Sequence, residues 1–138
     1  MKGTVWLSGL LGVGAVLETL AGLGLLVCPS LLVSLLLGSP LPETGLVVAR
    51  IAGGGLLALG IACGYARATP TARVSLGVAG ALLTYNIVAC VTLALAQSVS
   101  TNRSLLLGAS ALHGMLAIGL LAALVVWNRH HAATQLFS

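Results

Sequence analysis

Residues 5–27 read VWLSGLLGVGAVLETLAGLGLLV, an apolar run that contains a single charged side chain, Glu18. A helix that crosses the hydrocarbon core of a bilayer needs about 20 predominantly apolar residues. This run meets that requirement and ends at Cys28 and Pro29. Glu18 interrupts the run and no small-residue cleavage signature follows it, so we expect an uncleaved first membrane span and not a secretory signal.

Three further runs share this length and composition. With the first they give four predicted spans, at about residues 5–27, 45–66, 74–97 and 105–127. A membrane barrel would instead need strands of about ten residues with alternating polarity, whereas these runs are continuously apolar. The sequence therefore predicts an all-α, polytopic membrane four-helix bundle that forms a single transmembrane domain over residues 1–138.

The composition excludes a water-soluble protein and a nucleic-acid-binding one. Of the 138 residues, 59% are apolar and only 6% are charged, whereas a soluble domain carries roughly 25% charged residues. The basic residues do not cluster as phosphate binding requires. Cys28, Cys63 and Cys90 are far apart in the sequence, so we expect small packing residues and not a disulfide framework.

The distribution of basic residues predicts the orientation. With the two termini on the same side, that side holds Lys2, Arg67, Arg73 and Arg129, and the other side holds Arg103 and Glu43. Basic residues near span ends stay in the cytoplasm, and tryptophans prefer the headgroup boundary. Trp6 and Trp127 both fall at the expected cytoplasmic ends. We therefore expect both termini in the cytoplasm.

Between the first two predicted spans lies an apolar segment, residues 31–37, that is too short to cross a membrane. Apolar segments of about this length tend to lie in the interface or to fold back into the protein. We expect one of these two arrangements for residues 29–44.

Each predicted span carries a polar side chain in its interior: Glu18, Arg50, Asn86 with its neighbour Tyr85, and His113. Charged residues in this setting cost about 2.5 to 3.5 kcal/mol on insertion scales and indicate a functional site. Counted from the predicted outer ends of the spans, Glu18, Asn86 and His113 lie roughly 12 to 17 Å deep and Arg50 roughly 8 Å deep. We expect a shared polar layer whose members are candidates for ligand binding or proton coupling, and we assign none of them a catalytic role.

Glu18 and Arg50 form the expected ion pair of this layer. An isolated carboxylate in hydrocarbon would take up a proton, whereas an arginine stays charged, so pairing lowers the cost of both. Asn86 and His113 would supply the remaining hydrogen bonds. The layer then either fixes the register of the helices without any ligand or binds a small polar head group, a quinone or a proton-coupled substrate.

The predicted spans contain too few ligands for a metal ion or a haem. His113 is alone in the predicted spans, whereas a bis-histidine haem needs two, and with Glu18 it supplies only two of the three or four ligands of a metal site. His130 and His131 beside Arg129 are typical of a solvated tail. We therefore predict no metal and no cofactor, apart from a bound lipid or quinone.

Glycines at regular spacing predict how the helices pack. Gly14, Glu18 and Gly22 fall at four-residue intervals and so share one helical face, and Gly60 and Gly64 form a G-x-x-x-G motif. Small residues let membrane helices approach closely. We expect these positions to line the interior of the bundle, with a dimerisation face as the alternative.

Three stretches carry a resemblance to a known group: LETLAGLGLL at residues 17–26, LLLG at residues 35–38 and ARIAGGGLLALG at residues 49–60. They resemble small four-helix bacterial membrane proteins of the DoxX-like group, over roughly the first half of the chain. The resemblance implies a four-helix fold in a bacterial inner membrane. Because some members resemble subunits of quinol-oxidising or other membrane complexes, it also implies association with such a complex. It gives no catalytic motif to carry over.

Three functions remain open. The first, which we expect, is a non-catalytic accessory or assembly subunit whose partners are membrane lipids and another membrane protein or a second copy. The second is a small proton-coupled transporter that uses Glu18, similar to small multidrug resistance proteins, although the chain has few aromatic residues and Arg50 within reach. The third is a quinone- or lipophile-binding oxidoreductase subunit in which Glu18 and His113 exchange protons with a head group.

Overall fold

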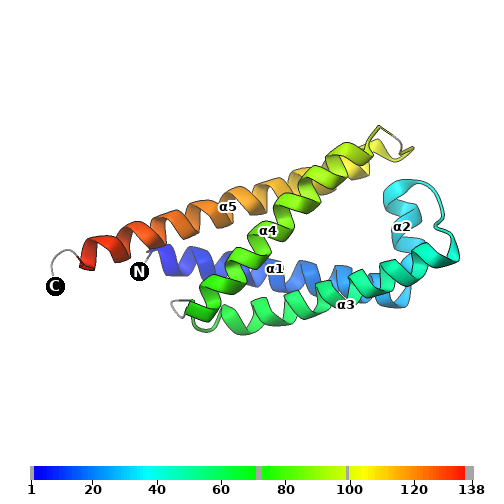
Figure 1. The fold of residues 1–138 in the computed structure, drawn as a ribbon. Coiled ribbons are helices and arrows are strands. Elements are labelled where there is room, and N and C mark those ends of the chain that lie inside the picture. Colours follow the sequence, from blue (N-terminus) through cyan, green and yellow to red (C-terminus); the bar gives the residue numbers. More distant parts are fainter. Residues whose placement is uncertain (1, 71–72, 99, 136–138) are drawn as a thin grey trace.

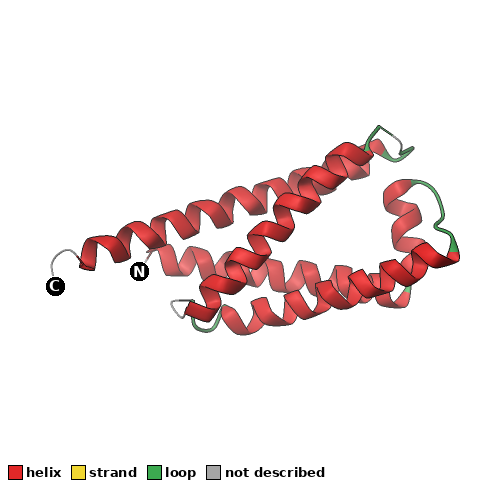
Figure 2. Ribbon diagram, in the orientation of Figure 1, coloured by secondary structure: helices red, strands yellow, loops and turns green. Residues whose placement is uncertain are grey.

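Helices account for nearly all of the computed structural model, which describes residues 2–70, 73–98 and 100–135, and the side chains of residues 4–70, 73–98 and 100–129. The helices are α1 (Lys2–Val27), α2 (Pro29–Leu37), α3 (Glu43–Ala66), α4 (Arg73–Ala96) and α5 (Arg103–Gln135). No strand occurs in the described residues (Figures 1 and 2). The side chains of Lys2, His130 and His131, and with them the predicted solvated tail, lie outside the described part.

Four of the helices are long and apolar enough to cross a membrane. These segments are Thr4–Val27, Glu43–Ala66, Arg73–Ala96 and Arg103–Arg129, each with a mean hydropathy of 2.0 or 2.1. They confirm the four predicted spans to within two residues at each end. The chain is an all-α membrane protein.

The order of the helices places the start of α1 and the end of α5 at the same end of the bundle. Figure 1 shows that α3 is also connected to α4 at this end. Successive crossings are therefore antiparallel, as predicted. The cytoplasmic location of this end stays a prediction.

The bundle consists of two helix pairs, since α1 packs most extensively against α3, and α4 against α5. Glycines set the distance between α1 and α3. A Cβ atom at Gly22 would stand 2.6 Å from the Leu57 nitrogen and 2.7 Å from the Gly53 oxygen, and one at Gly60 would stand 2.8 Å from the Thr19 nitrogen. Gly22 and Gly60 therefore line the interior of the bundle as expected, because only glycine permits this backbone approach.

The hydrophobic core lies at the end of the bundle that holds the chain termini. Its buried members come from all four long helices and are Leu7, Leu11, Cys63, Ala66, Ala79, Leu82, Leu120 and Ala123. Cys63 thus has the predicted packing role. Toward the other end, α4 and α5 diverge from α1 and α3, and α2 lies in the space between the two pairs (Figure 1).

The short apolar segment after α1 forms α2, which folds back against the bundle and contacts α1, α3 and α5. Pro29 stands in its first turn, a favourable position because the missing N–H would have no partner there. The helix ends at Gly38, whose φ of 75° lies in the left-handed region that favours glycine.

Three side chains of the loop between α4 and α5 hold the end of α2. Ser100 Oγ donates to the Leu37 carbonyl at 2.9 Å, Thr101 Oγ1 to the Gly38 carbonyl at 3.4 Å, and Asn102 Nδ2 to the Leu35 carbonyl at 2.7 Å. These bonds satisfy carbonyl groups that a helix end leaves without partners. The polar loop thus fastens α2 to the α4–α5 pair.

Candidate functional site

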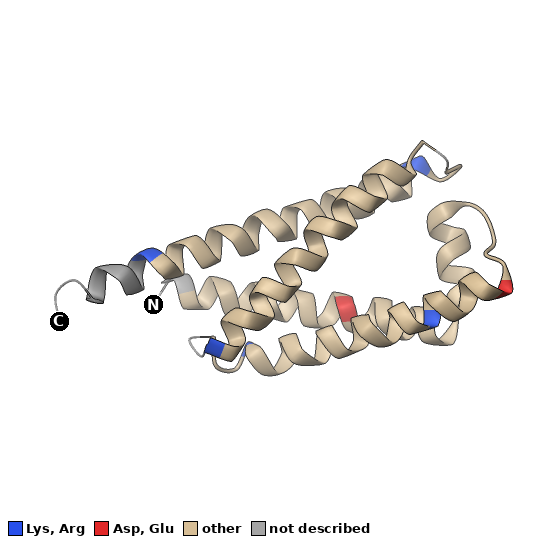
Figure 3. Cartoon of the chain, viewed as in Figure 1, with Lys and Arg blue, Asp and Glu red and all other residues tan. Residues whose placement is uncertain are grey.

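The predicted ion pair between Glu18 and Arg50 is not found in the structure. Glu18 is only 2% exposed, and its Oε1 atom has no hydrogen-bond partner. Arg50 is exposed on α3. Charged residues lie mainly at the helix ends (Figure 3), and within the described residues no arginine bonds to the Glu18 carboxyl.

The register of α1 against α3 explains this difference. Gly22 faces Gly53 and Leu57, whereas Gly60 faces Ala15 and Thr19. In these antiparallel helices, position 18 is therefore level with a position near 59, and Arg50 is level with a position near 27. Nine residues of helix separate the two side chains along the axis, or about 14 Å. This axial separation between Glu18 and Arg50 is larger than the one calculated from the predicted span ends.

Asn86 and His113 meet at the centre of the α4–α5 pair. Asn86 is fully buried, its Oδ1 atom lies 2.8 Å from His113 Nδ1, and its Nδ2 atom donates to the Leu82 carbonyl at 2.8 Å. The predicted common depth of these two residues is thus present in the structure. They bond to each other, however, and not to a Glu18–Arg50 pair.

The partners of Asn86 fix the tautomer of His113. A carbonyl oxygen only accepts, so the amide group that faces Leu82 must be the NH₂ and the group that faces His113 must be the oxygen. Nδ1 of His113 therefore carries a hydrogen. In the neutral imidazole, Nε2 is then left as a hydrogen-bond acceptor, and no described residue donates to it.

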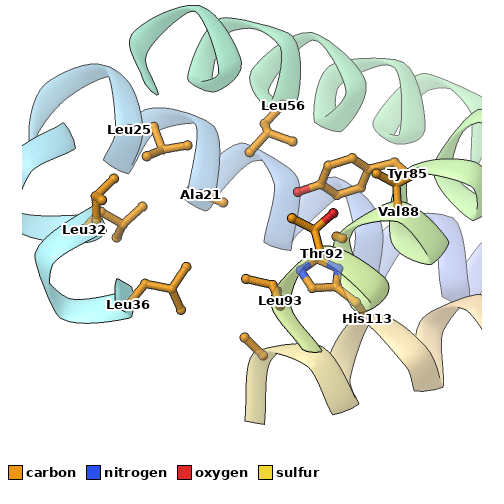
Figure 4. Close-up of a pocket in the computed structure, with 13 residues that line it drawn as sticks. Ala21, Leu25, Leu32, Leu36, Leu56, Tyr85, Val88, Thr92, Leu93 and His113 are labelled. Atoms are coloured by element: carbon orange, nitrogen blue, oxygen red, sulfur yellow. The ribbon is translucent and has the colours of Figure 1, made fainter. Parts of the chain in front are cut away.

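Tyr85 and His113 form one wall of a cavity of about 350 Å³ between the two helix pairs. Their rings meet edge to face, with centroids 5.7 Å apart and an interplanar angle of 83°. The other residues that line the cavity come from all five helices and are Ala21, Leu25, Leu32, Val33, Leu36, Leu56, Val88, Ala89, Thr92, Leu93 and Ala109. Figure 4 shows Tyr85, Thr92 and His113 on one side of the cavity and leucines of α1 and α2 on the other.

Three hydrogen-bonding groups converge on this cavity: the hydroxyls of Tyr85 and Thr92 and the imidazole of His113 (Figure 4). Neither hydroxyl has a hydrogen-bond partner among the described residues, although threonines in helices often bond to a carbonyl of the preceding turn. Thr84 does so, through Gly80. The cavity is therefore apolar with a small set of unsatisfied polar groups, which is the usual character of a ligand site.

Thr92 and the α2 leucines were not among the predicted site residues. Tyr85, Ala89 and Thr92 follow one another at helical spacing, so they share a face of α4. This spacing is a signal that could have pointed to Thr92. The leucines of α2 gave no such signal, because a short apolar run does not reveal what it covers.

Glu18 lies beside this cavity and not in its lining. Its carboxyl is close enough to Tyr85 and Cys63 for a charge on Glu18 to act on both. Ala21, one turn further along α1, does line the cavity. The structure thus brings Glu18, Tyr85, Asn86 and His113 into one region and leaves Arg50 outside it. No group of three or more His, Cys, Asp or Glu among the described residues could hold a metal ion.

Comparison with known proteins adds no assignment. No family model, no curated protein and no solved structure matches the chain.

Proposed function

We propose that the chain is a membrane-embedded binding protein for a lipophilic molecule with a small oxygen-bearing head group. The observation that carries this proposal is the cavity between the helix pairs, where the hydroxyls of Tyr85 and Thr92 and the imidazole of His113 face an otherwise apolar lining. A volume of about 350 Å³ lies within the range of small-molecule sites.

The polar groups suit a head group that both accepts and donates hydrogen bonds. A carbonyl oxygen of a quinone would accept a hydrogen bond from Tyr85 or Thr92, whereas a hydroxyl of the corresponding quinol would donate to His113 Nε2. Asn86 holds the imidazole in place through the 2.8 Å contact with Nδ1. Because the bonding partners of the head group would be fixed in advance, little ordering is needed on binding.

The tail of the ligand would lie along the leucines. Leu25, Leu32 and Leu36 face the polar residues across the cavity (Figure 4). Since the two helix pairs diverge at this end, an extended hydrocarbon tail could continue from the cavity into the bilayer. The helix α2 would cover the head group from the side of the α4–α5 loop.

Binding of a prenylated 1,4-benzoquinone to the detergent-purified protein tests the proposal. Ala109 lines the cavity, whereas Ala111 is exposed on the same helix. We expect Ala109→Leu to weaken binding by about tenfold or more because the added side chain occupies the ligand volume, and Ala111→Leu to leave it unchanged.

A second pair of variants examines the head group. Thr92→Ala removes a hydroxyl that faces the cavity, and Thr84→Ala removes one that bonds within its own helix. We expect only Thr92→Ala to weaken binding. Equal quinone affinity in the wild type, Ala109→Leu and Thr92→Ala proteins would show that the cavity is not the binding site.

We propose the setting of an accessory or assembly subunit of a larger membrane complex in a bacterial inner membrane, with the DoxX-like resemblance as its support. Purification in mild detergent tests it, since a chain that always elutes alone or as a homodimer contradicts this setting. The transporter hypothesis requires Glu18, and transport of tested cations that is unchanged by Glu18→Gln would contradict it.

A further inference from the structure

A second hollow lies on the outer surface of α1, away from the cavity between the helix pairs. It has a volume of about 390 Å³ and is lined by Gly9, Gly12, Val13, Val16, Leu17 and Arg67. Val13 and Val16 are 46% and 57% exposed, so this surface faces outward from the bundle. In a membrane, it faces lipid.

The guanidinium group of Arg67 rests directly on Gly12. A Cβ atom at Gly12 would stand 3.2 Å from Arg67 Nη1 and 3.3 Å from Cζ. Arg67 follows the last residue of α3, and Ser8 Oγ donates to its carbonyl oxygen at 2.9 Å. The glycine thus provides the space in which the cation lies against α1, and Ser8 holds the backbone from which the side chain extends.

Neither glutamate of the chain neutralises this cation. The only acidic residues are Glu18 and Glu43. Glu43 begins α3 and Arg67 follows its other end, while Glu18 is buried and its Oε1 atom has no bonding partner. No described side chain accepts a hydrogen bond from the guanidinium, which offers five N–H donors in a planar arrangement that matches a phosphate.

Exposed aromatic side chains mark the end of the bundle that holds Arg67. Trp6 on α1 and Tyr65 on α3 are 68% and 80% exposed at the same end of the bundle. Exposed Trp and Tyr side chains mark the headgroup boundary of a bilayer. Arg67, two residues after Tyr65, is therefore at headgroup level, and the valines of the hollow extend from it toward the hydrocarbon.

We infer that this hollow binds an anionic phospholipid. The phosphate accepts hydrogen bonds from the Arg67 guanidinium, and an acyl chain lies along Val13, Val16 and Leu17. A guanidinium and a phosphate form charge-assisted bonds, commonly as a bidentate pair. The apolar side of the hollow explains why the ligand is a lipid and not a free phosphate ion.

Native mass spectrometry of the full chain in micelles with equal amounts of phosphatidylglycerol and phosphatidylcholine tests the inference. We expect the wild type to retain phosphatidylglycerol in preference to phosphatidylcholine. Arg67→Gln should lower this preference about tenfold. Arg73→Gln is the matched control, since Arg73 is an exposed cation at the start of α4 on the same side, and it should retain the preference.

A second pair of variants keeps the test valid if Arg67→Gln fails to fold. Gly12→Leu retains the cation but fills the space that the Arg67 guanidinium occupies against α1. Gly77→Leu adds the same side chain where a Cβ meets nothing within 4 Å. We expect only Gly12→Leu to lower the retention of phosphatidylglycerol. Glycerol phosphate, which lacks acyl chains, should not displace the lipid at equal concentration.

Three outcomes would overturn the inference. Equal losses in Arg67→Gln and Arg73→Gln would indicate bulk charge attraction, and unchanged retention in both Arg67→Gln and Gly12→Leu would exclude the hollow. Complete displacement by glycerol phosphate would show a phosphate site without a lipid groove. None of these outcomes affects the quinone measurements, which concern a different cavity.

Discussion

Asn86 is completely buried and has hydrogen bonds on both sides of its amide group. It accepts from His113 and donates to Leu82, so the orientation of the imidazole depends on it. The cost of a buried polar group is low when it is paired and high when a partner is removed. Asn86 therefore connects the stability of the α4–α5 pair to the geometry of the candidate site.

We predict that Asn86→Ala lowers the free energy of unfolding by about 1 to 2 kcal/mol, because His113 Nδ1 loses its acceptor. Unfolding in mixed micelles monitored by circular dichroism measures this change. Thr84→Ala is the control, since its hydroxyl bonds only to Gly80 of the same helix. If both variants lose the same amount, the Asn86–His113 bond makes no special contribution.

The α1–α3 pair is the element whose geometry depends most on glycine. Gly22 lies within a short distance of the α3 backbone, whereas a Cβ atom at Gly55 would meet nothing within 4 Å. We predict that Gly22→Val destabilises the protein by about 1 to 3 kcal/mol, because the added methyls push the two backbones apart. Gly55→Val should change the stability much less. Unfolding of the two variants side by side checks this, and similar losses in both would contradict the close packing.

The short helix α2 depends on the α4–α5 loop for its position. Asn102 donates to the Leu35 carbonyl at 2.7 Å, whereas Ser98, in the same loop, donates to the nearby Leu95 carbonyl. We predict that Asn102→Ala increases amide hydrogen exchange across α2 about tenfold, because one bond of its C-terminal end is lost. Ser98→Ala should leave the exchange of α2 unchanged. Unaltered exchange in Asn102→Ala would mean that packing alone holds this helix.

At the scale of the whole molecule, hydropathy and length sufficed to predict the crossings, because a continuously apolar run satisfies its backbone within lipid only as a helix. The common depth of Asn86 and His113 also followed from span ends. The predicted Glu18–Arg50 pair was wrong, since the register of α1 on α3 depends on backbone contacts at Gly22 and Gly60 that no local pattern specifies. The cavity could not be predicted from the sequence either, because it arises where the two helix pairs diverge.

The orientation of the molecule in the membrane is a prediction that the charge distribution supports. The end that holds both termini and the α3–α4 turn includes Arg67, Arg73 and Arg129, and positive charges near span ends favour the cytoplasm. A fluorescent protein fused to the C-terminus should therefore fluoresce, whereas a fused alkaline phosphatase should be inactive. The combined Arg67→Gln and Arg73→Gln substitution should raise phosphatase activity, because it removes two of the charges that retain this end. An active phosphatase fused to the unaltered chain would contradict the predicted orientation and place this end outside the cytoplasm.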